Sequence, residues 1–352
     1  MSPRVREPLP MAPMSPLVPP DLSQAEIDAL TEEVRALAAE RDAVILAHNY
    51  QVPEIQAVAD YVGDSLGLSR QAAAVSQSVI AFCGVHFMAE SASILCPDKT
   101  VLIPDLDAGC SLADSITVPE LSAWQSKHPG AITVMYVNTT AEIKAITDYC
   151  VTSSNAVKVV EHLIAENGWQ DKVAAGERLP ILFGPDMWLG SYVEKALGVK
   201  IHVWDGECHV HAGIRPADIK EMRAEHPDAD FLIHPECGCS TQVMEFVAAG
   251  DVDSEGVHML STGQMLEYAR EHAGKGGTAI MATETGMLHG LQMAAPDVDF
   301  IAANERAACR YMKMITLDKL RDCLRDMTGE VKVDPKIAAK AIVPIERMVA
   351  IG

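Results

Sequence analysis

The sequence predicts an α/β protein built from three similar units, each a small parallel sheet covered by helices. Two observations support this fold: apolar strand-like runs alternate with helical segments along the chain, and one long segment recurs. A third observation concerns function. Cys110, Cys208 and Cys309 lie 98 and 101 residues apart, and each follows the last predicted strand of a unit. Three segments that each end in a cysteine can converge on one point.

The repeat is visible in two segments that share a single offset of 88 residues. The first begins VILAHNYQVPEIQAVADYVGDSL at Val44, and the second begins ITVMYVNTTAEIKAITDYCVTSS at Ile132. The offset pairs five identical residues, namely Glu54 with Glu142, Ile55 with Ile143, Asp60 with Asp148, Tyr61 with Tyr149, and Ser65 with Ser153. A weaker third copy begins FLIHPECGCSTQVMEFVAAGD at Phe231, and LSTGQM near Ser261 replaces GDSL and VTSS. Self-similarity of this kind is stronger evidence for repeated structural units than any single motif.

Each unit continues with a second and a third pair of helix and strand. The next predicted strands are SVIAFCGVH, LPILFGPDM and TAIMATETG, and the last ones are TVLIPD, KIHVWD and VDFIAA. The last strands lead into DAGCSLAD, GECHVH and NERAACRYM, which contain the three spaced cysteines. Because strands alternate with helices, we expect parallel sheets and three-layer α/β domains of about 90–100 residues each.

The predicted boundaries divide the chain into five parts: a Pro-rich disordered tail (1–22), three α/β repeats (23–113, 114–210 and 211–315) and closing helices (316–352). Ser23 and Glu26 form a capping-box pattern that opens a helix before the first repeat. The closing helices are amphipathic, and we expect them to pack back on the first repeat.

Composition excludes several classes of protein. With 49% hydrophobic and 22% charged residues the chain has an ordinary globular composition, and no apolar run reaches membrane-spanning length. A net charge of −21 without a basic patch argues against nucleic-acid binding. Nine cysteines without a C-x₂-C pair do not suggest a secreted disulfide framework, so we expect a cytoplasmic protein. The sequence contains no G-x-G-x-x-G turn after a strand and no Walker A loop, so no motif indicates a nucleotide cofactor.

Polar side chains follow the first strand of each unit, where the carboxyl end of a parallel strand exposes ligand-binding groups. They are His48, Asn49 and Tyr50 in the first unit, Tyr136 and Asn138 in the second, and His234 and Glu236 in the third. A single histidine at a strand end is more often structural than catalytic. Equivalent polar groups in three facing units favour a common active site at the centre, with the three cysteines at its floor.

Hydroxyl groups lie in the turn that precedes a helix in each unit. Ser65, Ser153, Ser261 and Thr262 are placed to cap these helices, an interaction that contributes about 1 kcal/mol each. The same hydroxyls and free backbone N–H groups can bind carboxylate or phosphate. Because the net negative charge of the protein repels anions, an anionic ligand would need such a local binding site.

Other cysteines allow an alternative. Cys237 and Cys239 lie near His234, and Cys208 precedes His209 and His211, so either group could contribute to a zinc site. Their spacing matches no common zinc pattern well. Four further cysteines lie in apolar segments and are predicted core thiols, namely Cys83, Cys96, Cys150 and Cys323.

The motifs HNYQ-x-PEIQ, AGCSLAD, YVN with VTSSNA, FGPD, W-x-GECHVH, HPEC and STG, in this order, resemble the quinolinate synthase (NadA) family. The resemblance runs from about Val44 to Met314. It implies three α/β domains around a pseudo-threefold axis and an enzyme of de novo NAD biosynthesis. That enzyme condenses iminoaspartate (iminosuccinate) with dihydroxyacetone phosphate to quinolinate, phosphate and water. It also implies a [4Fe–4S] cluster, whose open iron acts as a Lewis acid.

The resemblance carries over to individual positions. It implies cluster ligands at Cys110, Cys208 and Cys309, and catalytic residues at His48, Tyr50, Tyr136, His234 and Glu236. It implies substrate-binding residues at His48, Ser65, Tyr136, Asn138, Ser153, His211, His234, Glu236, Ser261 and Thr262. Some family members carry C-x₂-C-x₂-C at the third ligand, where this chain has Ala303, Arg306 and Cys309. A redox switch built from that triplet is therefore not expected.

The expected acid–base groups are Glu236 with His234 for the isomerisation, and Tyr50 with His48 near phosphate loss. An L-aspartate oxidase or an aspartate dehydrogenase is the expected functional partner, because iminoaspartate is unstable. Three alternatives remain: a related three-cysteine enzyme such as an isoprenoid diene-phosphate reductase or a diphthamide radical enzyme, an iron-responsive sensor, and a purely structural metal centre.

Overall fold

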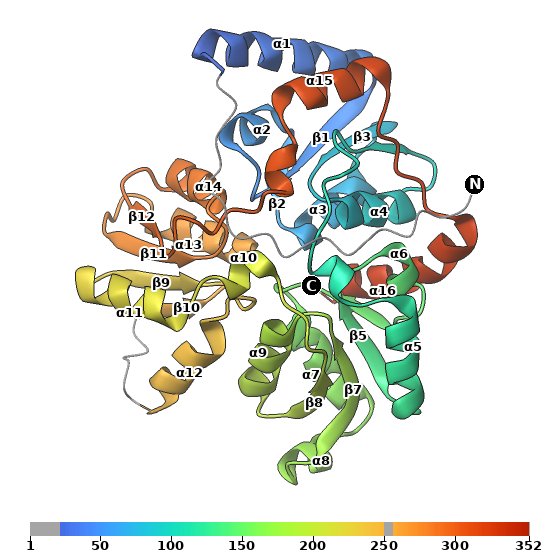
Figure 1. The fold of residues 1–352 in the computed structure, drawn as a ribbon, viewed down its shortest axis with the longest axis vertical. Coiled ribbons are helices and arrows are strands. Elements are labelled where there is room, and N and C mark those ends of the chain that lie inside the picture. The colour runs from blue at the N-terminus through green and yellow to red at the C-terminus, as the bar shows by residue number, and fades with distance from the viewer. Residues whose placement is uncertain (1–21, 250–255, 352) are drawn as a thin grey trace.

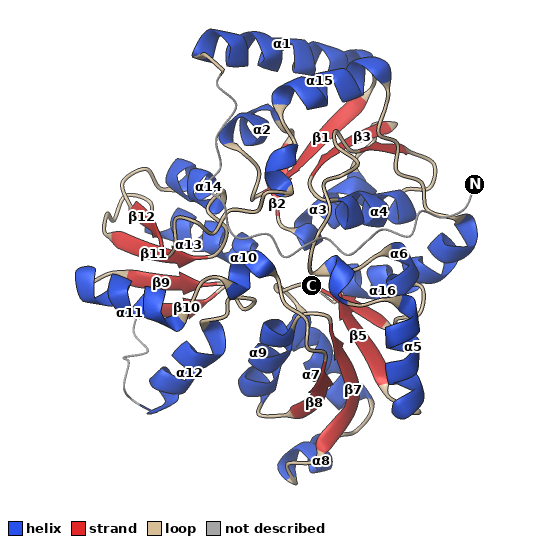
Figure 2. Ribbon diagram, viewed as in Figure 1, coloured by secondary structure: helices blue, strands red, loops and turns tan. Residues whose placement is uncertain are grey.

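The protein is described by a computed structural model that covers residues 22–249 and 256–351. It contains three four-stranded parallel sheets, one in each repeat (Figures 1 and 2). The strand orders are β2-β1-β3-β4, β6-β5-β7-β8 and β10-β9-β11-β12, the same topology three times. The prediction of three similar α/β units with parallel sheets is therefore confirmed.

The first unit contains α1 (Gln24–Glu40), β1 (Ala43–His48), α2 (Pro53–Val58), β2 (Tyr61–Gly63), α3 (Ser65–Ala74), β3 (Val79–Cys83), α4 (His86–Leu95) and β4 (Thr100–Leu102). Every residue of β3 and all but the first residue of β1 are buried. Such continuous apolar runs are typical of a parallel sheet that helices cover on both faces. Figure 1 shows α3 and α4 on one side of this sheet and α1 and α2 on the other.

The second unit contains the 3₁₀ turn η1 (Ala113–Ser115), α5 (Val118–Lys127), β5 (Ile132–Tyr136), α6 (Ala141–Lys144), β6 (Tyr149–Val151), α7 (Ala156–Glu166), α8 (Gln170–Ala174), β7 (Arg178–Gly184), α9 (Met187–Leu197) and β8 (Lys200–Val203).

The third unit contains α10 (His209–Ala212), α11 (Pro216–Glu225), β9 (Asp230–Ile233), α12 (Ser240–Ala249), β10 (Val257–Met259), α13 (Thr262–His272), β11 (Thr278–Ala282), α14 (Met287–Ala294), β12 (Asp299–Ala302) and the 3₁₀ turn η2 (Met312–Met314). Figure 1 shows the three units surrounding the middle of the molecule, with α10 close to it.

Two helices close the chain. α15 (Leu317–Asp326) packs against α1 and β3 of the first unit. α16 (Pro335–Ala350) packs against α3 and α4 of the first unit and also against α6 and β6 of the second. α16 therefore joins two repeats. In the part of the chain that the structure describes, no helix combines the length and apolarity needed to cross a bilayer.

Helix capping follows the sequence in part. Ser23 and Glu26 form the expected capping box at α1, and Ser261 caps α13 with Gln264. Ser65 does not cap α3, because the Asp64 carboxylate accepts the Gly67 N–H at 2.7 Å instead. Likewise α7 begins after Asn155, two residues beyond Ser153. The hydroxyls of Ser65 and Ser153 are thus not used as helix caps.

Candidate active site

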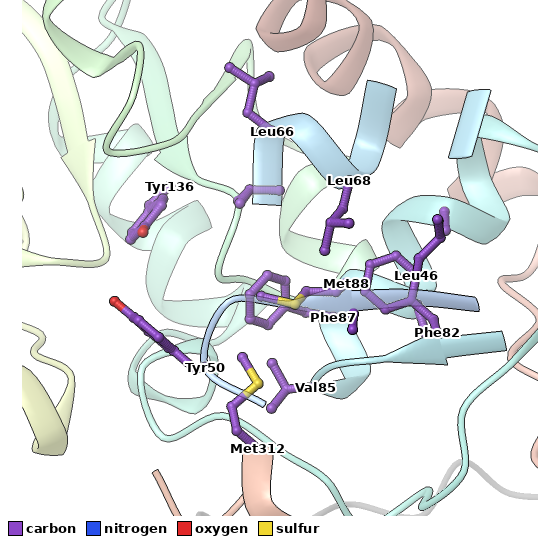
Figure 3. Packing of buried hydrophobic residues seen from close by; sticks show 14 of the residues in the cluster. Leu46, Tyr50, Leu66, Leu68, Phe82, Val85, Phe87, Met88, Tyr136 and Met312 are labelled. Atoms are coloured by element: carbon purple, nitrogen blue, oxygen red, sulfur yellow. The ribbon is translucent and has the colours of Figure 1, made fainter. Parts of the chain in front are cut away.

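The first strand of each unit carries polar side chains to one place. β1 ends at His48, β5 ends at Tyr136, and β9 ends one residue before His234. Figure 3 shows the rings of Tyr50 and Tyr136 extending from the apolar core, with their hydroxyl groups directed toward each other. Side chains that follow strands of different sheets therefore meet at the centre of the molecule.

These side chains line a cavity of about 700 Å³, its opening to solvent included. All of the site residues predicted from the sequence line it except Ser261: His48, Tyr50, Ser65, Cys110, Tyr136, Asn138, Ser153, Cys208, His211, His234, Glu236, Thr262 and Cys309. Ser261 is buried and caps α13. The structure brings the predicted residues together, and their individual roles remain predictions.

The three cysteines reach the cavity from the loop that follows the last strand of each unit. Cys110 follows β4, Cys208 precedes α10, and Cys309 follows β12. Burial raises the pKa of Cys110 well above its usual value, and the nearby Cys208 and Cys309 raise it further. Burial also raises the pKa of Cys309 to about 12, with Glu284 and Cys208 adding to the effect. Cys110 and Cys309 therefore need a strongly cationic partner to ionise together.

The donor set fits an iron–sulfur cluster. All three cysteines are free of disulfides and line the same cavity. Thiolates are the usual ligands of iron–sulfur clusters, and three of them leave one corner of a cubane open.

A hydrogen-bonded network surrounds Glu236. Its Oε2 lies 3.2 Å from Nδ1 of His211, and its Oε1 accepts from the Tyr136 hydroxyl. Burial alone would raise the pKa of Glu236, but the facing His211 and His234 and the Tyr136 hydroxyl lower it to about 2. The carboxylate is therefore ionised inside the cavity wall.

The histidines of the cavity differ in their ionisation. Burial lowers the pKa of His48 to about 3 and that of His234 to about 4, so both rings are neutral near pH 7. His211 behaves in the opposite way. Burial would lower its pKa, but the neighbouring acidic groups of Tyr50, Cys208 and Glu236 raise it well above the usual value. Two neutral imidazoles and one charged imidazole thus line the same cavity.

The turns of the three units also meet. The Ser154 hydroxyl donates to the Asp64 Oδ2 at 2.7 Å, which links the second unit to the first. The Asn49 amide donates to Thr262 at 3.1 Å, which links the first to the third. A Cβ at Gly263 would lie 2.9 Å from the Asp64 Oδ2, so a larger residue there would displace the carboxylate that accepts from Ser154. The hydroxyl-rich turns are thereby held at one wall of the cavity.

Sequence reasoning missed two residues at the end of β11. Thr283 lies 2.6 Å from the Tyr50 hydroxyl and 3.0 Å from Nε2 of His211, and Glu284 lines the cavity. Both follow the strand run TAIMA, so the rule applied to the first strands would have found them if extended to the third strand of each unit. The zinc alternative at Cys237 and Cys239 is wrong for this structure, because a disulfide joins these two cysteines.

The fold and the cavity define a class of protein, an α/β enzyme in which three repeats bring three cysteines and an acid–base network to one site. The family described as "Quinolinate synthetase A protein" matches residues 32–350. Curated proteins named "Quinolinate synthase" include one from Mycobacterium tuberculosis strain H37Rv, 53% identical over 91% of this chain and 88% of the relative. Another, from Mycobacterium sp. strain KMS, is 52% identical over 91% of both chains. The chain belongs to the quinolinate synthase family.

Proposed function

We propose that this chain condenses iminoaspartate with dihydroxyacetone phosphate to give quinolinate, phosphate and two waters, a step of de novo NAD biosynthesis. The observation that carries the proposal is one cavity that combines three free cysteines with the Tyr50, His211 and Glu236 network. Family membership supports the same reaction, since the related proteins carry that name.

Cys110, Cys208 and Cys309 would hold the [4Fe–4S] cluster. When bound, the cluster supplies a Lewis acid for substrate oxygen atoms. The buried Glu284 carboxylate accepts the Cys309 N–H at 2.8 Å and so fixes the loop of the third ligand. Outer contacts of this kind orient metal ligands.

The proton transfers are assigned to two pairs of side chains. Glu236 and the neutral His234 lie side by side, with Nδ1 of His234 3.7 Å from Oε1 of Glu236, and we assign this pair to the proton transfers of the carbonyl–enamine isomerisation. His48 accepts the Tyr50 N–H at its Nδ1, so the neutral ring carries its proton on Nε2 and can donate it to a leaving oxygen. The Tyr50 hydroxyl, 3.1 Å from Nε2 of His211, can relay a proton at the same side.

The anionic groups of the substrates are assigned to the turns. Ser65, Ser153 and Thr262 line the cavity near the starts of α3, α7 and α13, where backbone N–H groups and the helix dipole favour anions. The buried Oδ1 of Asn138, also in the cavity wall, has no hydrogen-bond partner. An unpaired buried acceptor costs free energy, and a substrate amine or hydroxyl would satisfy it.

Anaerobic incubation of the cluster-loaded protein with the two substrates tests the proposal. Quinolinate should form without an electron donor and without S-adenosylmethionine, and this separates the reaction from the reductases and radical enzymes that share three cysteines. Since iminoaspartate is unstable, an L-aspartate oxidase or aspartate dehydrogenase should be present to supply it. Absence of quinolinate from fully loaded protein would overturn the assignment.

Two variants separate catalysis from cluster binding. Glu236→Gln should keep the visible absorbance of the cluster and lose at least about 100-fold in turnover, because a general base contributes about that much or more. Cys208→Ser should lose the absorbance together with the bound iron and sulfide. Unchanged iron and sulfide in Cys208→Ser would reject that ligand, and normal turnover of Glu236→Gln would reject the base.

A further inference from the structure

A second set of metal donors shares only one cysteine with the three described above. Among the described residues, the side chains of Cys208, His211 and Glu236 place one donor atom each within 4.8 Å of one another. His211 and Glu236 are buried, and Cys208 is half-buried. Thiolate, imidazole and carboxylate together are a donor set that zinc accepts, with a fourth position left open.

His211 presents the correct nitrogen. Its Nε2 lies 3.0 Å from Thr283 Oγ1 and 3.1 Å from the Tyr50 hydroxyl, so this nitrogen is engaged on the side away from Glu236. Its buried Nδ1 faces Glu236 and lies 3.2 Å from Oε2 of that carboxylate. An imidazole whose other nitrogen is fixed by a hydroxyl is how proteins orient a metal-binding histidine.

Glu236 is held in the same way. Its Oε1 accepts from the Tyr136 hydroxyl, which leaves Oε2 directed at His211. In the metal-free chain the Nδ1 proton joins this nitrogen to Oε2 at 3.2 Å, and a cation that displaces the proton can bind both atoms. In a tetrahedral zinc site donor atoms are about 3.3–3.8 Å apart, a value that follows from bond lengths of about 2.0–2.3 Å. The three donors need to approach by only about 1 Å.

We propose that the cluster-free chain binds one divalent cation of the zinc type through Cys208, His211 and Glu236. The site is distinct from the three-cysteine site, but both need Cys208, so a cluster and the single ion exclude each other. The hard cations Mg²⁺ and Ca²⁺ prefer all-oxygen ligands and do not suit a thiolate. The ion would also occupy the carboxylate assigned as the base. The site rests on donor geometry and is independent of the proposed reaction.

Cobalt titration of the full-length chain, with its cluster removed under anaerobic conditions, tests the site. Co²⁺ replaces zinc in such sites and reports thiolate ligation and four-coordination through its visible spectrum. We expect one Co²⁺ per chain, displaced by one Zn²⁺. Cys208→Ser, His211→Asn and Glu236→Gln should each weaken binding by about 100-fold, since even removal of an outer contact costs about 10–100-fold. Thr283→Val removes such an outer contact and should cost about tenfold.

Cys110→Ser and Cys309→Ser are the matched controls. Both lack a proposed cluster ligand, yet each should bind Co²⁺ within threefold of the parent chain. If either weakens binding as much as Cys208→Ser, the ion lies on the three cysteines and the proposal is overturned. Unchanged affinity in both Glu236→Gln and His211→Asn would overturn it as well, and Glu236→Asp provides a second variant if Glu236→Gln does not fold.

Reconstitution gives a readout separate from activity. Chains preloaded with Zn²⁺ should gain cluster absorbance only as zinc is released into solution. Chains that hold one zinc and one complete cluster together would contradict the shared ligand. A chain that lacks quinolinate activity but binds Co²⁺ as described would leave this inference intact and overturn only the proposed function.

Discussion

Glu284 joins the site of the third cysteine to the first unit. This fully buried carboxylate accepts the N–H groups of Cys309 and Gly286 and pairs with Lys313 at 3.1 Å. Lys313 in turn donates to the carbonyl of Tyr50. Through Lys313, the Glu284 side chain therefore couples the position of the Cys309 loop to that of Tyr50.

Glu284→Gln should lower the free energy of unfolding by about 3 kcal/mol, because it leaves the buried ammonium of Lys313 without its counter-charge. Urea denaturation of the cluster-free chain measures this. Glu305→Gln, which removes an exposed carboxylate nearby, should change stability by less than about 0.5 kcal/mol. Adding Lys313→Met to Glu284→Gln should recover part of the loss. Equal stabilities of Glu284→Gln and Glu305→Gln would show that the pair contributes nothing.

His48 gives the stability a pH dependence. Its pKa is about 3 in the folded chain, because of burial, against about 6.5 when unfolded. The unfolded state thus binds more protons between these values. The contribution of neutral His48 is complete above about pH 6.5 and is lost as the pH falls toward about 3, by up to about 1.4 kcal/mol per pH unit.

His48→Gln should therefore give a shallower fall of unfolding free energy over that pH range than the parent chain. Denaturant titrations at several pH values measure the slope. His162→Gln is the control, since the His162 side chain is 46% exposed. Parallel pH profiles of the parent chain and His48→Gln would contradict the assignment.

At the level of single residues, the sequence predicted which side chains lie in the cavity better than it predicted their hydrogen-bond partners. Polar residues after apolar strands correctly indicated His48, Tyr136 and Glu236 as neighbours in space, because strand ends of a parallel sheet converge. The capping prediction at Ser65 was wrong, since Asp64 competes for the same N–H groups with a charged oxygen. Thr283 and Glu284 were missed, because their contacts are with residues distant in the sequence. Thr283 contacts Tyr50, and Glu284 pairs with Lys313.

Among the elements, α16 has the most unusual position. Its backbone carbonyls accept from Arg70 of the first unit and Asn155 of the second, at 2.8 and 2.9 Å. Ile345 is fully buried, whereas Val343 on the same helix is 43% exposed. The helix therefore presents one face to the seam between two units.

Ile345→Ala should lower the free energy of unfolding by about 2–5 kcal/mol, the usual range for a fully buried isoleucine. Val343→Ala should cost about 0.5 kcal/mol or less, since its side chain is already hydrated. Thermal or urea unfolding of both variants gives the comparison. Similar losses in the two would mean that α16 does not bury the face described.

The apolar pattern of the sequence was sufficient to predict the strands of each unit, but not which elements pack against one another. The apolar runs indicated all the central strands, because both faces of a parallel sheet are covered. An amphipathic pattern in α16 says that one face is buried, but not against which element. Contact with the second unit depends on the arrangement of the three sheets, which no local pattern records.

On the scale of the whole molecule, the net charge of −21 opposes the approach of the proposed anionic substrates. Added salt screens this repulsion, since the Debye length falls from about 30 Å at 0.01 M to about 8 Å at 0.15 M. We expect kcat/KM for dihydroxyacetone phosphate to rise over this range, through faster association. Steady-state kinetics at several concentrations of a non-coordinating salt test this, with the unfolding midpoint as control. A fall in kcat/KM would show that local cationic groups dominate the field.

The order of the units along the chain has a consequence for biosynthesis. A ribosome releases the first and second units while Cys309 and α16 are still to be translated, and domains made early can fold before later ones exist. A nascent chain that holds Cys110 and Cys208 therefore has two of the three thiols and lacks the third. If the three cysteines hold a cluster as proposed, iron and sulfide delivered before translation is nearly finished would meet an incomplete pocket.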